Sequence, residues 1–122
     1  MARIAAARAT SDDIRALEAC ISQMEATADD FALFMKHDIA FHRRVAEITG
    51  NPIYVAMSEA LLTWLSKFHI GEVRKVGREA RTLDEHRHIL DRIAAHDVEG
   101  AAAAMQVHQT RAADSYRRRQ EG

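Results

Sequence analysis

The sequence has few of the residues that break helices or cross-link chains. Its 122 residues include five glycines, one proline and one cysteine, Cys20. Because the turn formers that separate strands are scarce and alanine is frequent, the composition favours helices over strands. A lone cysteine cannot form an intrachain disulfide, so nothing in the chain requires an oxidising compartment, and we expect a cytoplasmic location.

Long hydrophobic runs and an excess of charge of one sign are also absent. No apolar stretch approaches the ~20 residues that span a bilayer, and the N-terminal segment is too short and too rich in arginine for a secretory signal. The formal net charge of −1 excludes a globally basic nucleic-acid binder. The hydrophobic content of 48% is typical of a soluble globular protein and excludes a disordered chain. We therefore expect a single domain over residues 1–122, without membrane contact.

The periodicity of apolar residues predicts an all-α fold, an antiparallel bundle of five or six helices. Gly50 followed by Pro52 is typical of one helix ending and the next beginning. The turn before Val98 is too short for anything but antiparallel packing of the last two helices. The expected helices cover residues 2–9, about 11–25, about 30–49, about 52–68, about 82–96 and about 98–118.

Two helix starts have a side-chain pattern that caps free backbone N–H groups. Thr10 is followed by Asp13 in a T-x-x-D start signal, and Thr82 is followed three residues later by Glu85, which predicts a capping box. Residues 69–81 include two glycines and read as a loop with at most one helical turn.

Apolar residues at steps of three and four predict which face of each helix is buried. In the fourth helix, the expected inward stripe consists of Ile53, Met57, Leu61, Trp64 and Phe68.

Polar residues interrupt the inward stripes of three other helices. Asp38 lies on the stripe of the third helix, and His42 follows four residues later on the same side. His86 lies on the inward row of the fifth helix, and His108 lies in the middle of the sixth. A buried carboxylate is costly unless it is paired or bound to a metal, and a buried imidazole needs partners for its nitrogens. One divalent ion would satisfy all four side chains.

The donor set suits zinc, nickel, cobalt, manganese or iron, since no thiolate narrows the choice. The Asp-x-x-x-His spacing is weak on its own, and a single inward histidine is more often a hydrogen-bonded core residue. Four such residues on three stripes favour a metal site. The alternative is a metal-free helical interaction module in which the same side chains are paired by hydrogen bonds.

The remaining histidines do not join this set. His88 lies about 200° around the helix from His86, and His37 lies about 100° from Asp38. His96 is expected at a helix C-terminus, where a cation is favourable. His69 falls in the predicted loop, where a solvated role is expected.

Several motifs resemble those of one known family. Residues 38–43, DIAFHR, followed by GNP at 50–52, resemble the D-x-x-F-H…G-N-P pattern of the FCD domain. This is the C-terminal effector domain of the FadR subfamily of GntR transcriptional regulators. Residues 85–90 resemble its E-H-x-x-I-L motif, residues 101–108 its final A-x-x-x-M-x-x-H helix, and residues 10–17 its T-x-x-D-x-x-x-L helix start.

The resemblance implies an antiparallel helical bundle that binds one divalent metal, zinc foremost, through Asp38, His42, His86 and His108. It also implies a homodimer in which a small organic acid binds over the metal and changes the geometry of a regulator on its operator DNA. The family's winged helix-turn-helix and the first half of its first helix have no counterpart here. We therefore expect a truncated first helix, and DNA binding only through an N-terminal domain that this chain lacks.

An arginine could bind the anionic effector. Arg81, five residues before His86, is the first candidate for a charge-assisted contact, and the alternative is a solvated charge at a helix start. The basic run at 117–119 is explained by the helix dipole rather than by DNA.

An enzyme is the remaining alternative. The dipeptides at 37–38 and 96–97 are both His-Asp, the motif of helical metal-dependent HD phosphohydrolases. Because His37 and His96 lie off the inward stripes, we expect a sensing module and not an enzyme.

Overall fold

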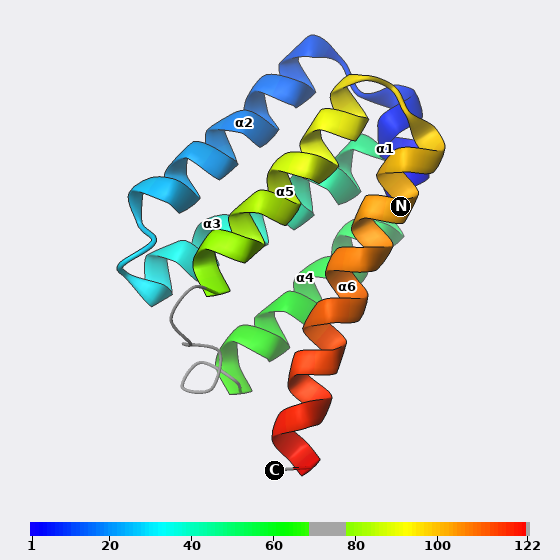
Figure 1. Cartoon of the computed structure of the whole chain (residues 1–122). Helices are drawn as coiled ribbons and strands as arrows, with labels where there is room; N and C mark the ends of the chain where they lie inside the picture. Colours follow the sequence, from blue (N-terminus) through cyan, green and yellow to red (C-terminus); the bar gives the residue numbers. More distant parts are fainter. Residues whose placement is uncertain (69–77, 122) are drawn as a thin grey trace.

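The computed structural model describes residues 1–68 and 78–121, and this part of the chain folds into six helices joined by short turns (Figure 1). No strand occurs among these residues, so the predicted all-α bundle is confirmed. None of the helices found there is both long enough and apolar enough to cross a membrane. The helices are α1 (Ala2–Arg8), α2 (Ser11–Ala26), α3 (Phe31–Ile48), α4 (Pro52–Phe68), α5 (Arg78–Ala94) and α6 (Val98–Glu121).

The helices α3 and α5 lie at the centre of the bundle. Figure 1 shows α2 beside both of them, while the short α1 contacts α3, α5 and α6 at one end. Helix α6 packs on α5 and α1, and α4 contacts α3 alone among the described helices. The core is built from apolar side chains of α2, α3 and α5 with almost no exposed surface, and its largest members are Phe41, Leu17, Ile21, Met24, Ile89, Ile93 and Val45.

Two of the expected helix boundaries have the predicted chemistry. The Thr10 hydroxyl accepts a hydrogen bond from the Asp13 backbone N–H at 3.2 Å, and the Asp13 carboxylate accepts one from the Thr10 N–H at 3.0 Å. This capping box satisfies free donors at the start of α2. Gly50 has a φ of +74°, a left-handed conformation in which a side chain would be strained, and it ends α3 just before Pro52.

The predicted capping box at Thr82 is wrong. Helix α5 begins at Arg78, so Thr82 lies inside the helix, and residues 78–81 are helical rather than part of a loop. The preceding residues 69–77, with His69, lie outside the described residues. The Glu85 carboxylate accepts a hydrogen bond from His108, and the backbone carbonyl oxygen of Thr82 accepts one from His86, so both residues contribute to the core at a position inside the helix.

The predicted inward stripe of α4 is also wrong. Ile53 is 64% exposed, Met57 63% and Trp64 46%, while the side chains of Leu61 and Phe68 lie outside the described part of the structure. Regular spacing identifies an apolar face, but burial requires a neighbour, and the described residues of this face of α4 are exposed.

The turn between α5 and α6 is anchored to α1. His96 adopts a φ of +54° after the end of α5, and its Nδ1–H donates to the Ala6 carbonyl oxygen at 2.8 Å. Asp97 then caps α6, because its carboxylate accepts from the backbone N–H of Gly100 at 3.0 Å. His96 therefore has a structural role, beyond the solvated one that its position predicts.

Candidate metal centre

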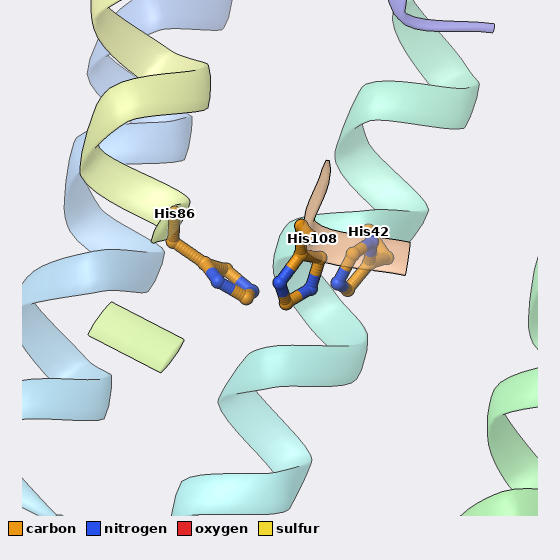
Figure 2. A group of neighbouring side chains, drawn as sticks. All are labelled: His42, His86 and His108. Atoms are coloured by element: carbon orange, nitrogen blue, oxygen red, sulfur yellow. The ribbon is translucent and has the colours of Figure 1, made fainter. Parts of the chain in front are cut away.

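Three histidines from three helices converge in the interior of the bundle. Figure 2 shows the rings of His42 from α3, His86 from α5 and His108 from α6 pointing toward one another. These residues are 8%, 0% and 9% exposed. One ring nitrogen of each lies within 4.8 Å of the others. Two nitrogens bound to one zinc ion lie at most about 4 Å apart, since each Zn–N bond is ~2.0–2.1 Å, so the cluster is close to the spacing that one ion requires.

The packing of the rings fixes this arrangement. His42 and His108 are stacked with centroids 5.4 Å apart, and the His86 ring stands nearly perpendicular to both, at 5.0 Å and 4.7 Å. The fully buried ring of Phe41 lies 4.5 Å from that of His86 and closes one side of the cluster. The site is therefore a defined interior cluster, with an aromatic wall that limits access of water.

Asp38 completes the cluster with a carboxylate. Its Oδ1 lies 2.6 Å from Nε2 of His86 and 3.3 Å from Nε2 of His42. Burial by itself raises the pKa of this carboxyl, but the hydrogen bonds and charges of His42 and His86 outweigh it, and the pKa falls far below its ordinary value. Asp38 is therefore an anion at neutral pH.

The hydrogen bonds of His86 test whether a metal fits. Its Nδ1 lies 2.7 Å from the carbonyl oxygen of Thr82, and because a carbonyl only accepts, Nδ1 must carry the proton. Nε2 lies 2.6 Å from the Asp38 oxygen, which is the distance of a hydrogen bond that needs a proton on Nε2. A divalent ion would take the place of that proton, with the Nε2 lone pair and the carboxylate oxygen as its ligands. The donor set therefore fits a divalent ion.

His108 has its own partner outside the cluster. Its Nδ1 lies 2.7 Å from Oε1 of Glu85, and Arg111 holds the same carboxylate with two hydrogen bonds of 2.5 Å. Burial raises the pKa of Glu85, but the bonds to Arg111 and His108 outweigh it and the pKa is lowered. Burial lowers the pKa of His108, which Glu85 only partly offsets. The arrangement favours a neutral imidazole beside an ionised carboxylate.

Sequence reasoning missed Glu85 and Arg111. The sequence pattern predicts that Glu85 caps a helix. Its partner His108 lies on another helix, so no spacing in the sequence connects the two residues. Arg111 offered a usable signal: it lies three residues after His108 and thus on the same side of α6. Of the four residues that the sequence selected, the structure brings His42, His86 and His108 together as one group, and Asp38 lies against His86 and His42.

Arg81 does not join them. It is exposed and, with His88, Arg92 and Glu85, lines an outer groove of about 430 Å³ between α5 and α6. Arg81 precedes His88 by seven residues, about two turns, so both lie on the outward face of α5. The prediction that Arg81 binds an effector beside the histidines therefore lacks geometric support, whereas the outward orientation of His88 is as expected.

Comparison with known proteins shows the family to which this helical bundle belongs. A family model for the FCD domain matches residues 1–111, and the chain belongs to this family, the effector-binding domain of GntR-type transcriptional regulators. The resemblance seen in the motifs of the sequence is thus confirmed.

Curated relatives share this part of their sequence. The chain is 34% identical over 110 residues to the HTH-type transcriptional repressor NanR of Edwardsiella tarda (strain FL6-60), and 36% identical to that of Salmonella schwarzengrund (strain CVM19633). Each match covers 88% of this chain and 42% of the relative, so the chain spans about two-fifths of the length of these proteins.

The family is regulatory rather than catalytic, as expected, and the hydrolase alternative is without support. The two His-Asp dipeptides also fail structurally, since His96 bonds to Ala6 near the α5–α6 turn and His37 is not one of the three clustered histidines.

Proposed function

We propose that this domain senses a small organic acid through a divalent metal ion held by Asp38, His42, His86 and His108. The observation that carries the proposal is the convergence of three buried imidazole nitrogens from three helices, with an ionised carboxylate against two of the rings. Zinc suits three histidines and one carboxylate best, and nickel, manganese, cobalt and iron also accept these ligands. When bound, such an ion supplies a positive centre that attracts a carboxylate group.

The residues of this chain define what the site accepts. Asp38 contributes one negative charge, so a divalent ion there retains a net positive charge that favours an anion. Phe41 covers one side of the cluster and keeps it dry, which strengthens the attraction between opposite charges. The Thr82 carbonyl fixes the proton of His86 on Nδ1 and leaves Nε2 directed at the site.

The proposed metal site connects the helices that contact the N-terminal helix α1. Its ligands come from α3, α5 and α6, and α1 contacts these same three helices. The bond from His96 to Ala6 ties α1 to the α5–α6 turn. A change in the positions of α3, α5 and α6 on ligand binding would therefore shift α1, at the N-terminal end of the domain. We infer that a cytoplasmic regulator containing this domain binds its operator through an N-terminal winged helix-turn-helix outside residues 1–122.

We also propose that the domain forms a homodimer through the exposed face of α4. Ile53 and Met57 lie one turn apart there and expose about two-thirds of their surface. The occupant that fits is a second copy of this chain, since α4 has only one acidic and one basic residue. Two copies of so weakly charged a face meet without repulsion, whereas a charged partner would find no complement.

The test is metal analysis of the purified protein. We expect about one divalent ion per chain, and mass spectrometry should detect a small acid that co-purifies with it. Adding zinc to chelated protein should stabilise it by ~2.7 kcal/mol when free zinc is a hundredfold above its dissociation constant. Protein that contains no metal and takes up none would contradict the proposal and favour the metal-free interaction module, in which hydrogen bonds such as Asp38–His86 suffice.

A further inference from the structure

We propose that Glu85 is a positioning residue for His108, and that Arg111 holds Glu85 in the required orientation. This inference rests on the proposed metal site. The Glu85 carboxylate accepts a hydrogen bond from His108 Nδ1–H, which leaves Nε2 as the nitrogen that carries the lone pair toward His42 and His86.

The geometry supports this assignment directly. Oε1 of Glu85 lies 2.7 Å from Nδ1 of His108. Nε and Nη2 of Arg111 donate to Oε2 and Oε1 of the same carboxylate at 2.5 Å each. A bidentate guanidinium contact fixes both oxygens, so the carboxylate cannot turn freely away from the imidazole. An ionised carboxylate only accepts, and the proton must therefore lie on Nδ1 of His108.

The same turn of α5 performs this task twice. The Thr82 carbonyl oxygen accepts from Nδ1–H of His86 at 2.7 Å, and Glu85 accepts from Nδ1–H of His108. Both rings therefore direct Nε2 into the cluster. The two acceptors differ in one respect: a backbone oxygen cannot be removed by substitution, whereas Glu85 can. A carboxylate partner also increases the basicity of the ring nitrogen that faces a metal.

The role explains why a charged pair lies so close to the core. The side chains of Glu85 and Arg111 are only 17% and 22% exposed, and a largely buried ion pair between two helices is seldom retained for stability alone. Glu85 also borders the outer groove between α5 and α6, so it separates the histidine cluster from solvent.

Zinc affinity tests the inference, measured by competition with a chromophoric chelator. Glu85→Ala should weaken zinc binding ~10–100-fold, as is typical when the partner of a ligating histidine is lost. Glu85→Gln keeps an acceptor oxygen and should recover part of that loss. Asp84→Ala is the matched control, because Asp84 is the neighbouring carboxylate on α5 and is exposed. An unchanged affinity in Glu85→Ala, or an equal loss in Asp84→Ala, would overturn the inference.

Nitrogen NMR of zinc-free protein provides a readout that a purely structural role would not change. In the wild type, His108 should carry its proton on Nδ1, and in Glu85→Ala part of the population should move it to Nε2. A proton on Nε2 in the wild type, or an unchanged tautomer in a folded Glu85→Ala protein, would refute the role of Glu85. Wild-type protein that shows the Nδ1 tautomer but binds no zinc would contradict the proposed function instead.

Discussion

Helices α3 and α4 are neighbours with equally regular apolar stripes, but the stripe of α3 is buried and that of α4 is exposed. On α3 the stripe that includes Phe41 and Val45 is fully buried, because α2, α1 and α4 all contact this helix. On α4 the stripe that includes Ile53 and Met57 faces outward, because α3 is its one described neighbour. Periodicity therefore identifies which residues share a face, and only the tertiary arrangement decides whether anything covers it.

Removing one large side chain from each stripe should give the largest difference in stability between the two helices. Phe41→Ala should lower the free energy of unfolding by ~3–5 kcal/mol, because the ring is fully buried against His42 and His86. Met57→Ala should change the stability of the monomer by less than about 0.5 kcal/mol. Urea denaturation at low protein concentration measures both. Equal losses in the two variants would mean that the face of α4 is buried in the folded monomer.

An inward and an outward histidine should differ in their effect on zinc affinity. His108→Ala removes a proposed ligand and should weaken zinc binding by ~100-fold or more, beyond the effect expected for a residue that only supports a ligand. His88→Ala, on the exposed face of α5, should leave the affinity unchanged. Isothermal titration with zinc compares the two. If His88→Ala lost as much affinity as His108→Ala, the proposed ligand set would be incorrect.

The α4 stripe should matter for association rather than for folding. Ile53→Asp places a charge in the exposed face and should raise the dimer dissociation constant at least about tenfold, since a buried unpaired charge costs several kcal/mol. Val107→Asp is the matched control, because Val107 is 63% exposed but lies on α6. Sedimentation or light scattering over a range of concentrations measures the effect. A wild-type protein that stays monomeric, or a control that dissociates equally, would contradict the assignment of this face.

Zinc affinity should also depend on pH. Zinc binding requires neutral imidazoles, so apparent affinity should fall as pH decreases, by up to about tenfold per pH unit for each ligand that becomes protonated. Burial holds the pKa of His108 below the ordinary value of 6.5, so this ligand stays neutral at pH 7 and is lost only in more acidic solution. Asp38 stays ionised throughout, because its pKa is lowered. Affinity that is constant or rises between about pH 7 and about pH 5 would contradict the histidine ligands.

Much of the fold and of the candidate site could be predicted from local patterns. The Thr10 cap, the Gly50–Pro52 boundary and the inward position of Asp38 and His86 all depend on neighbours within one or two helical turns. Contacts between residues this close in the sequence can be inferred from residue spacing alone.

What could not be predicted has two causes. Glu85 meets His108 across two helices, so no spacing in the sequence connects them. The Thr82–His86 bond lies within α5, but it uses a backbone carbonyl, which every residue has, so the identity of Thr82 does not reveal it. Arg81 is a helical residue because α5 begins one turn earlier than its capping pattern indicates, and its place in the helix puts it on the outward face with His88. For Glu85 the local pattern was compatible with a helix cap and with a contact to another helix, and the packing of α5 against α6 selected the contact.

We propose that metal in the histidine cluster creates the binding site for an acid, and calorimetry with citrate can show whether acid binding depends on the metal. Citrate would be titrated into zinc-loaded wild-type protein, into chelated wild-type protein and into His108→Ala protein exposed to the same zinc. We expect measurable binding to the first sample and none to the other two, because the carboxylate needs the positive centre that the four side chains hold. Equal citrate binding in all three samples would show that the acid binds without the metal.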